Sequence, residues 1–305
     1  MNQNNFKNNM KTILVPTDFS KDAETALFYA IDIANKTKAK IILLHSFHIS
    51  YTSGYVPENR IEKDIQEATA KWNKDLKNLY DNTSHHSKNP VEFISTENSA
   101  VDAILSVAKE RKVDLIIMGT QGINKIVGRQ IFGTKSSKII EQASCPVMIV
   151  PEERIHNEVK KMVYATEFLE SDIPCLQSLT EIAKAFDAEI EVVHISAQET
   201  ESVKEKEQLE NFKQQVLKNT SYAKLSFKRL AGNGVEQKLE AYMQEDVEMD
   251  MLVMSAHHRN FKDKLFGRSH TKAMALYVKI PLLVFHHERN KSDDAADHIV
   301  DKLIF

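Results

Sequence analysis

Short apolar runs alternate with longer amphipathic stretches along almost the whole chain. In the first half these runs are rich in Ile, Val and Leu and show no alternation with polar residues. They are Thr12–Pro16, Lys40–His45, Val91–Ser95, Asp114–Met118 and Val147–Val150. Such runs are typical of strands that are buried on both faces of a parallel sheet. The pattern therefore predicts a five-stranded parallel sheet in the first half.

The stretches between the runs have the spacing of amphipathic helices. After the first run the apolar positions are Ala23, Ala26, Leu27, Ala30 and Ala34, and Ser20 precedes them as a candidate N-cap. After the second run they are Ile61, Ile65, Ala68, Trp72, Leu76 and Leu79. Neighbouring parallel strands need crossovers of this kind, which are right-handed in nearly all proteins. The predicted fold class is thus α/β, with a doubly wound sheet.

The second half repeats the first, segment by segment and in the same order. The matched pairs are Lys11–Phe19 with Lys160–Phe168, Ile41–His45 with Ile190–His194, Asp114–Thr120 with Asp250–Ala256, and Cys145–Val150 with Ile280–Phe285. Leu176, Leu179, Ile182, Ala183 and Phe186 repeat the first helical pattern. We therefore expect two related domains in tandem, residues 1–152 and 153–288, followed by a tail, residues 289–305, outside the repeat.

Composition excludes several classes of partner. The chain has 305 residues and a formal net charge of -3, whereas nucleic-acid-binding surfaces are normally basic. Its only cysteines, Cys145 and Cys175, form neither a disulfide framework nor a metal-ligand pattern, which favours a reducing cytoplasm. No stretch approaches the roughly 18 apolar residues of a membrane helix. Neither nucleic acid nor a membrane is therefore expected as a partner.

Glycine is concentrated after the fourth predicted strand. The chain has 8 glycines, and Gly119, Gly122, Gly128 and Gly133 all lie in this one stretch. Ligands of open α/β sheets bind beyond the carboxyl ends of the strands. Glycine lets a backbone approach a ligand closely, and a helix that begins after Gly133 would present an N-terminus suited to phosphate. The residues alone leave two interpretations open, a phosphate-binding loop or glycines that only shape turns.

Five segments carry a resemblance to a known family, and they are Ile13–Ser20, Ile42–His45, Asp114–Gly122, Phe132–Thr134 and Cys145–Pro151. They resemble the universal stress protein family, over nearly all of residues 10–151 and more weakly over residues 159–287. ATP-binding members have a G-x2-G-x9-G-[S/T] pattern. Gly119, Gly122, Gly133 and Thr134 match its glycines and hydroxyl, with one extra residue in the second gap.

The resemblance implies that the first domain binds ATP or AMP. Pro16 and Thr17 would line the site, with Asp18 at the adenine or ribose, the Ser46 backbone at the base, and Met118 and Gly119 along the ribose. The phosphates would contact Gly122, Gly133, Thr134, Lys135 and Ser136, and Mg²⁺ could bridge them. The alternative role for Asp18 is that of a helix-capping or loop carboxylate.

The second domain lacks this set of residues. Ser255 stands in place of Gly119, His258 in place of Gly122, and Glu167 in place of Asp18. A histidine side chain at the position of Gly122 should obstruct the approach of a phosphate. We therefore predict that the second domain does not bind ATP and serves as a structural or regulatory partner. The resemblance further implies that the fifth strands, Val147–Val150 and Leu282–Phe285, pair across a pseudo-two-fold axis. Homo-oligomerisation stays open.

No catalytic residue and no metal site is predicted. The chain has no P-loop, and no Ser–His–Asp or Cys–His set can be placed at one strand end. The histidine pairs, His85–His86, His257–His258 and His286–His287, lack the spacing of metal ligands. We expect His45 and His194 to be structural and Trp72 to be a core residue.

Three functions remain open from the sequence. The first is a cytoplasmic stress-response protein with ATP or AMP as a regulatory ligand. The second is a nucleotide-free interaction or scaffold protein of the same fold, which the extra residue before Gly133 favours. The third is a slow ATP hydrolase, for which the sequence offers no evident general base.

Overall fold

The computed structural model describes residues 10–51, 55–83, 86–120, 134–151, 159–196, 200, 202–231, 241–242, 249–256 and 280–286. The first half contains β1 (Thr12–Pro16), α1 (Lys21–Thr37), β2 (Lys40–Phe47), α2 (Glu58–Asp81), β3 (Val91–Glu97), α3 (Ala100–Glu110), β4 (Leu115–Gly119), α4 (Thr134–Gln142) and β5 (Val147–Val150). The second half contains β6 (Lys161–Thr166), α5 (Asp172–Phe186), β7 (Glu189–Ser196), α6 (Val203–Asn219), β8 (Leu225–Ala231), β9 (Met251–Ala256) and β10 (Leu282–His286). The predicted tail lies outside the described residues.

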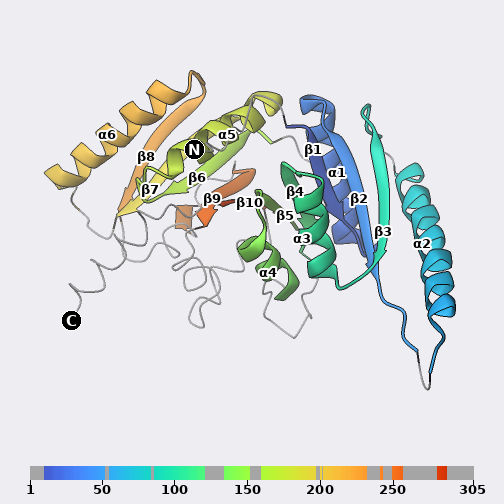
Figure 1. The fold of residues 1–305 in the computed structure, drawn as a ribbon. Coiled ribbons are helices and arrows are strands. Elements are labelled where there is room, and N and C mark those ends of the chain that lie inside the picture. Colours follow the sequence, from blue (N-terminus) through green and yellow to red (C-terminus); the bar gives the residue numbers. More distant parts are fainter. Residues whose placement is uncertain are drawn as a thin grey trace, which may run out of the picture.

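All ten of these strands belong to one sheet, in the order β3-β2-β1-β4-β5-β10-β9-β6-β7-β8 (Figure 1). Within each half the neighbouring strands are parallel, and the doubly wound order of the first half recurs in the second. The halves meet where β5 and β10 run antiparallel, with Leu283 opposite Met148 and Val284 opposite Val147. The predicted pairing of the two fifth strands is therefore confirmed.

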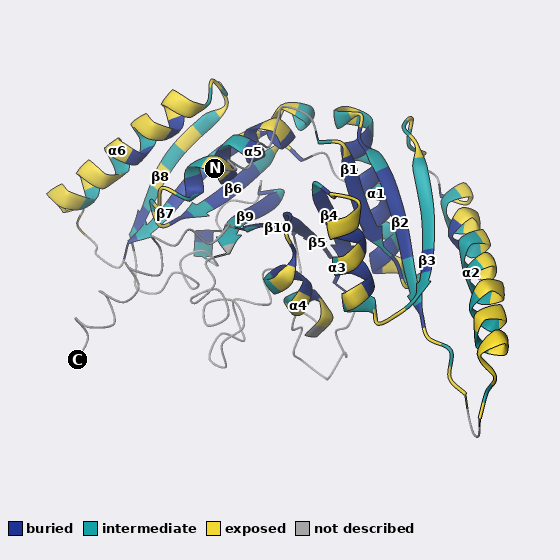
Figure 2. Cartoon of the chain, in the orientation of Figure 1, coloured by how far each residue is buried: buried dark blue, intermediate teal, exposed yellow. Residues whose placement is uncertain are grey.

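Helices cover both faces of the sheet. One core cluster joins the odd-numbered residues of β1 and β2 to α1 and α2, and extends to α5 and α6. The other cluster joins the even-numbered residues of these strands to α3 and α4. Because α1 and α5 lie on the same face and the halves run in opposite directions, the approximate two-fold axis is perpendicular to the sheet. Figure 2 shows the central strands mostly buried, the outermost strands β3 and β8 mostly intermediate, and the helices exposed on their outer sides.

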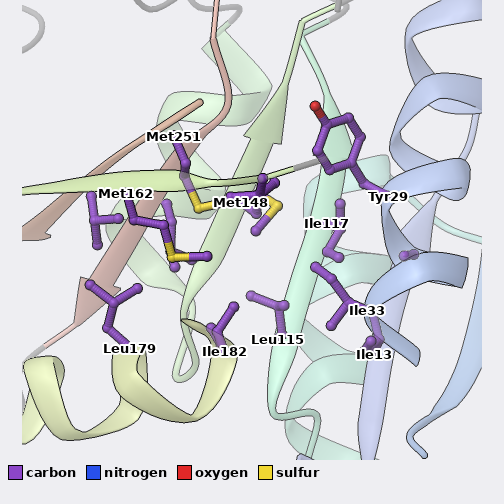
Figure 3. Packing of buried hydrophobic residues seen from close by; sticks show 14 of the residues in the cluster. Ile13, Tyr29, Ile33, Leu115, Ile117, Met148, Met162, Leu179, Ile182 and Met251 are labelled. Carbon is purple, nitrogen blue, oxygen red and sulfur yellow. The ribbon is translucent and has the colours of Figure 1, made fainter. Parts of the chain in front are cut away.

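The core on the α1 and α5 face is continuous across the seam between the halves. Met148 of β5 packs into the same cluster as Met162 and Met251 of the second half, and Figure 3 shows these three side chains together. Lys36 near the end of α1 places its ammonium 4.1 Å from the centre of the Phe186 ring in α5. The two halves thus share apolar contacts as well as backbone hydrogen bonds.

Two aspartates tie the strands together at the amino-terminal edges of the two half-sheets. Asp114, predicted as the first residue of a strand, lies just before β4, and its Oδ2 accepts hydrogen bonds from the backbone nitrogens of Lys11 (2.8 Å) and Thr12 (2.9 Å). Asp250 accepts in the same way from the nitrogens of Lys160 and Lys161. The sequence repeat therefore preserves a carboxylate clamp as well as the apolar runs.

Candidate functional site

The carboxyl ends of β1, β2 and β4 and the first turn of α4 define one edge of the first half-sheet. Leu14, Leu44 and Met118 belong to the core cluster on the α3 and α4 face. Because side chains alternate along a strand, Pro16 and Ser46 point to this same face. Three of the predicted site residues, Pro16, Ser46 and Met118, are therefore brought together on the side where α4 begins.

The Ser46 backbone lies beyond the end of β1. Even-numbered residues of β2 exchange hydrogen bonds with β1: Lys40 N donates to Lys11 O (2.9 Å), and Leu44 O accepts from Thr17 N (2.8 Å). Ser46 continues this series, but its register partner in β1 is past Pro16, the last residue of that strand. Its peptide groups consequently face the space that β1 has left. This is the geometry that a planar base with hydrogen-bonding edges requires.

The loop after β1 holds Asp18 at the surface. Its Oδ1 accepts a hydrogen bond from Ser20 N (3.1 Å), and the buried Thr17 accepts one from Phe19 N (3.0 Å). Phe19 adopts a positive φ of 64°. The loop carboxylate role that sequence reasoning kept as an alternative for Asp18 is thus present, and the side chain is also exposed at the site edge.

His45 fixes this loop from the opposite face. Its Nδ1 lies 2.9 Å from Thr17 O, and because a carbonyl only accepts, Nδ1 carries the proton. The ring lies 4.8 Å from Phe19 and 4.5 Å from the half-buried Trp72, centre to centre. His194 makes the same contact with Thr166 O at 3.0 Å and stacks on Phe168 at 4.0 Å. Both histidines are structural, as predicted.

Gly119 has its own packing role. A Cβ at this position would lie 2.6 Å from the carbonyl carbon and Cβ of Asp22, in the first turn of α1. Asp22 is buried, and its Oδ2 accepts a hydrogen bond from the Thr120 hydroxyl at 2.6 Å. The close approach of α1 to β4 therefore demands glycine here. Sequence reasoning missed Asp22, although a carboxylate on the apolar face of a helix was a signal.

Ser136 is the most informative residue at the start of α4. It is 0% exposed, and its Oγ has no hydrogen-bond partner within the described part of the chain. Such hydroxyls usually have a partner, because burying one alone is costly. The first-turn nitrogens of a helix likewise lack intrahelical partners. Lys135 is exposed beside them. Thr134 begins α4, while Gly122, Gly133 and His258 lie outside the described residues.

In the second half, Asp172 and Ser255 stand where the first half has Asp22 and Gly119. A closed network of hydroxyls surrounds this aspartate. Asp172, 0% exposed, accepts hydrogen bonds from Tyr164 (2.9 Å), Thr166 (2.7 Å) and Ser255 (2.7 Å). Burial, and then the neighbouring Cys175 and Asp172, raise the pKa of the Tyr164 phenol, so it stays a hydrogen-bond donor. The serine that replaces Gly119 is thus directed to a carboxylate, which agrees with the predicted divergence of this half.

Charged side chains occupy the ends of β7 and β8. Arg229 places its Nε 3.2 Å from Glu205 of α6 and donates from Nη2 to Ser196 Oγ at 3.0 Å. The Ser196 hydrogen bond and the Arg229 guanidinium lower the pKa of the Glu205 carboxyl. His194 Nε2 lies 3.7 Å from the same carboxylate. This edge therefore carries ion pairs between its own side chains.

No obvious catalytic group emerges from the described residues. Burial raises the pKa of the Cys145 thiol to about 12 and also raises that of Cys175, so both stay protonated and inert at neutral pH. In the described parts of the chain, no three His, Cys, Asp or Glu side chains gather as metal ligands. None of the described helices combines the length and apolar character needed to span a membrane.

Comparisons with known proteins agree with this arrangement. The model of the Universal stress protein family matches the chain twice, over residues 9–151 and 158–286. A universal stress protein of Bacillus subtilis, YxiE, is 30% identical over 145 residues, 45% of this chain and 97% of that protein. One from Thermus aquaticus is 29% identical over 141 residues, 46% of this chain and 98% of the relative.

Solved structures match over nearly the full length. A universal stress protein from Archaeoglobus fulgidus has a TM-score of 0.58 at 15% identity and covers 93% of this chain and 98% of its own. A protein of unknown function from Pseudomonas aeruginosa has a TM-score of 0.59 at 15% identity, covering 92% and 93%. At these identities the likeness establishes the fold, two such units in one chain.

Proposed function

Since the chain belongs to the universal stress protein family, with two family units in tandem, we propose that its first half binds an adenine nucleotide, ATP or AMP, as a regulatory ligand. The proposal rests on one observation, the burial of the Ser136 side chain. A buried hydroxyl in the first turn of α4, with no partner among the described residues, is a donor placed for phosphate oxygens. The proposed setting is a cytoplasmic stress response.

In our proposal the nucleotide would lie in one orientation. The phosphates would lie at the start of α4, held by Thr134, Lys135, Ser136 and the glycines Gly122 and Gly133. Pro16, Met118 and Gly119 would line the ribose side, and the free edge of Ser46 would read the base. Asp18, exposed at the loop, would reach a ribose hydroxyl. Mg²⁺ would neutralise phosphate charge, keeping most of its water ligands.

We assign no nucleotide to the second half. Ser255 there is bonded to Asp172, and the strand ends carry the Arg229–Glu205 ion pair. Opening these contacts would remove one of the three hydroxyl donors of Asp172 and would separate the Arg229 guanidinium from its carboxylate, and both changes cost free energy. The proposal is therefore one nucleotide for each chain, in the domain that spans residues 1–152.

Equilibrium dialysis of the full chain with labelled ATP tests this function. We expect saturable binding at one site, competed by AMP and weakened at least tenfold by Gly133→Val, because a branched side chain would block the approach to phosphate. In the second half, Phe266-Gly267-Arg268 repeats Phe132-Gly133-Thr134, and Gly267→Val should leave the affinity unchanged. No binding at millimolar ATP would favour the nucleotide-free scaffold protein instead.

A further inference from the structure

One contact links the second half directly to the helix of the proposed phosphate site. His286, the last residue of β10, donates a hydrogen bond from Nε2 to the carbonyl oxygen of Ile140 in α4. The two residues are far apart in the sequence and belong to different family units. The nitrogen must be the donor, because a carbonyl oxygen only accepts.

The topology of the sheet explains why these residues meet. Because β10 runs antiparallel to β5, its carboxyl end lies beside the start of β5, with Val284 opposite Val147. The chain enters β5 directly from α4, which ends at Gln142. His286 is two residues beyond Val284, so its side chain points to the same face of the sheet as Val284, where α4 packs.

The hydrogen bond completes the carboxyl end of α4. The last four carbonyls of a helix have no intrahelical partner. Ile139 O accepts from Ala143 N at 2.9 Å, and the next carbonyl, Ile140 O, accepts from the imidazole. A histidine donor at a helix C-terminus is favourable for the helix dipole as well. Within α4, Ser136 lies one helical turn before Ile140, on the same side of the helix.

We propose that His286 is a positioning residue, through which the second half holds α4 so that its first turn can receive phosphate. This inference rests on the proposed function of the first half. A helix of 9 residues is marginal by itself, so its placement depends on contacts at both ends. It gives the second half, which carries no nucleotide in our proposal, a task in the binding of one.

Among the described residues, this contact runs from the second half to the first. By the sequence repeat, Pro151 of the first half corresponds to His286. Proline has no side-chain donor and no backbone N–H, so it cannot provide the same hydrogen bond in return. The asymmetry of this pair parallels that of Gly119 and Ser255, because the half that keeps the glycine is also the half that receives the histidine contact.

The test combines amide hydrogen exchange with nucleotide binding on the full chain. His286→Ala should raise the exchange of the α4 amides about tenfold without nucleotide, since one hydrogen bond is lost. It should weaken ATP and AMP at least threefold while leaving adenosine unchanged, because α4 faces the phosphates and not the base. His286→Gln, which restores a donor of similar reach, should recover both. His86→Ala, an exposed histidine away from α4, is the control.

Unchanged α4 exchange in His286→Ala overturns the inference, and so does faster exchange with unchanged ATP affinity. An equal loss of ATP and adenosine binding also contradicts it, because that result indicates general damage to the fold. If the wild-type chain binds no nucleotide, the proposed function fails, and the exchange measurement still decides whether His286 holds α4.

Discussion

A single missing Cβ decides how closely α1 packs against β4. Asp22 lies so near Gly119 that no side chain fits between them. The second half solves the same problem differently. Its loop between β6 and α5 is one residue longer than the loop between β1 and α1, and Ser255 bonds to Asp172 there. The two halves share a buried aspartate, which accepts a hydrogen bond from Thr120 in the first half and from Tyr164, Thr166 and Ser255 in the second.

Gly119→Ala should therefore destabilise the protein by about 1–3 kcal/mol, the usual cost of forcing an extra carbon into a packed site. Urea unfolding followed by circular dichroism measures it. Ser255→Ala is the matched control, since it ends with the same side chain at the corresponding position and loses one hydrogen bond, about 1 kcal/mol. A Gly119→Ala protein as stable as the wild type would show that α1 moves away without penalty.

Ser136→Ala should separate binding from stability. Because the Ser136 hydroxyl is buried without a partner in the described residues, its removal should leave the free energy of unfolding unchanged or raise it by up to about 1 kcal/mol. The affinity for ATP should fall about fivefold to tenfold, because one phosphate donor is lost. Calorimetric titration measures the affinity, with Ser137→Ala as the neighbouring control. A stable variant with wild-type affinity would contradict the assignment.

At the scale of elements, α1, α3 and α6 begin as local capping rules predict, whereas Pro57 before α2 and Ser171 before α5 make no side-chain cap hydrogen bond. Ser20, Ser99 and Ser202 all have extended backbones and accept hydrogen bonds from the helix they precede, from Ala23 N, Asp102 N and Glu205 N. The candidate cap at Ser20 is therefore confirmed. The carboxyl ends of α1 and α5 are less favourable. The residues that follow them, Lys38 and Asp187, adopt the left-handed backbone conformation, with φ of 62° and 55°.

Lys38→Gly should stabilise the protein by about 0.5–1 kcal/mol, because glycine adopts the left-handed conformation without steric cost. Thermal unfolding should show a higher midpoint. Asp187→Gly is the comparison: this aspartate bonds to Lys224 through its carboxylate and its carbonyl, so the gain should be smaller or absent. A lower midpoint for Lys38→Gly would mean that the lysine side chain contributes more than its backbone costs.

At the scale of the whole molecule, the contact between the two halves, at β5 and β10, determines how the chain unfolds. The core cluster on the α1 and α5 face contains residues of both halves, and β5 and β10 share a backbone ladder. Exposing one half alone would leave Met148, Met162 and Leu283 partly uncovered. The free energy of keeping one half folded without the other is thus unfavourable, and the two halves should unfold together.

The two cysteine thiols can test whether the halves unfold together, because each half contains one. Both are buried with raised pKa values, that of Cys145 about 12, so neither should react with a disulfide reagent at pH 8 in the folded protein. In Cys145→Ala and Cys175→Ala, the remaining thiol should become reactive at the urea midpoint that circular dichroism gives for that variant. A thiol that reacts at clearly lower urea would show that its half opens independently.

The apolar runs and the repeat were sufficient to predict the fold class and the five strands of the first half, whereas the pairing of the fifth strands was implied by the family resemblance. Strand ends were less certain, because tertiary contacts extend them: β2 reaches Phe47 and β3 reaches Glu97 through seven pairings, from Ile41 with Val91 to Phe47 with Glu97. Asp114 looked like a strand residue and is a clamp, since a carboxylate near a strand's start can be satisfied by backbone nitrogens across the sheet.

The candidate site, like the fold, could be predicted from the sequence only in part. The sequence by itself determined which half keeps glycines at the strand end, because residue identity alone decides whether a side chain is present. Only the tertiary structure decided that Gly119 faces Asp22, that Ser136 is buried without a partner among the described residues, and that His286 meets Ile140. Those contacts join residues distant in the chain, and no local pattern contains the distance between them.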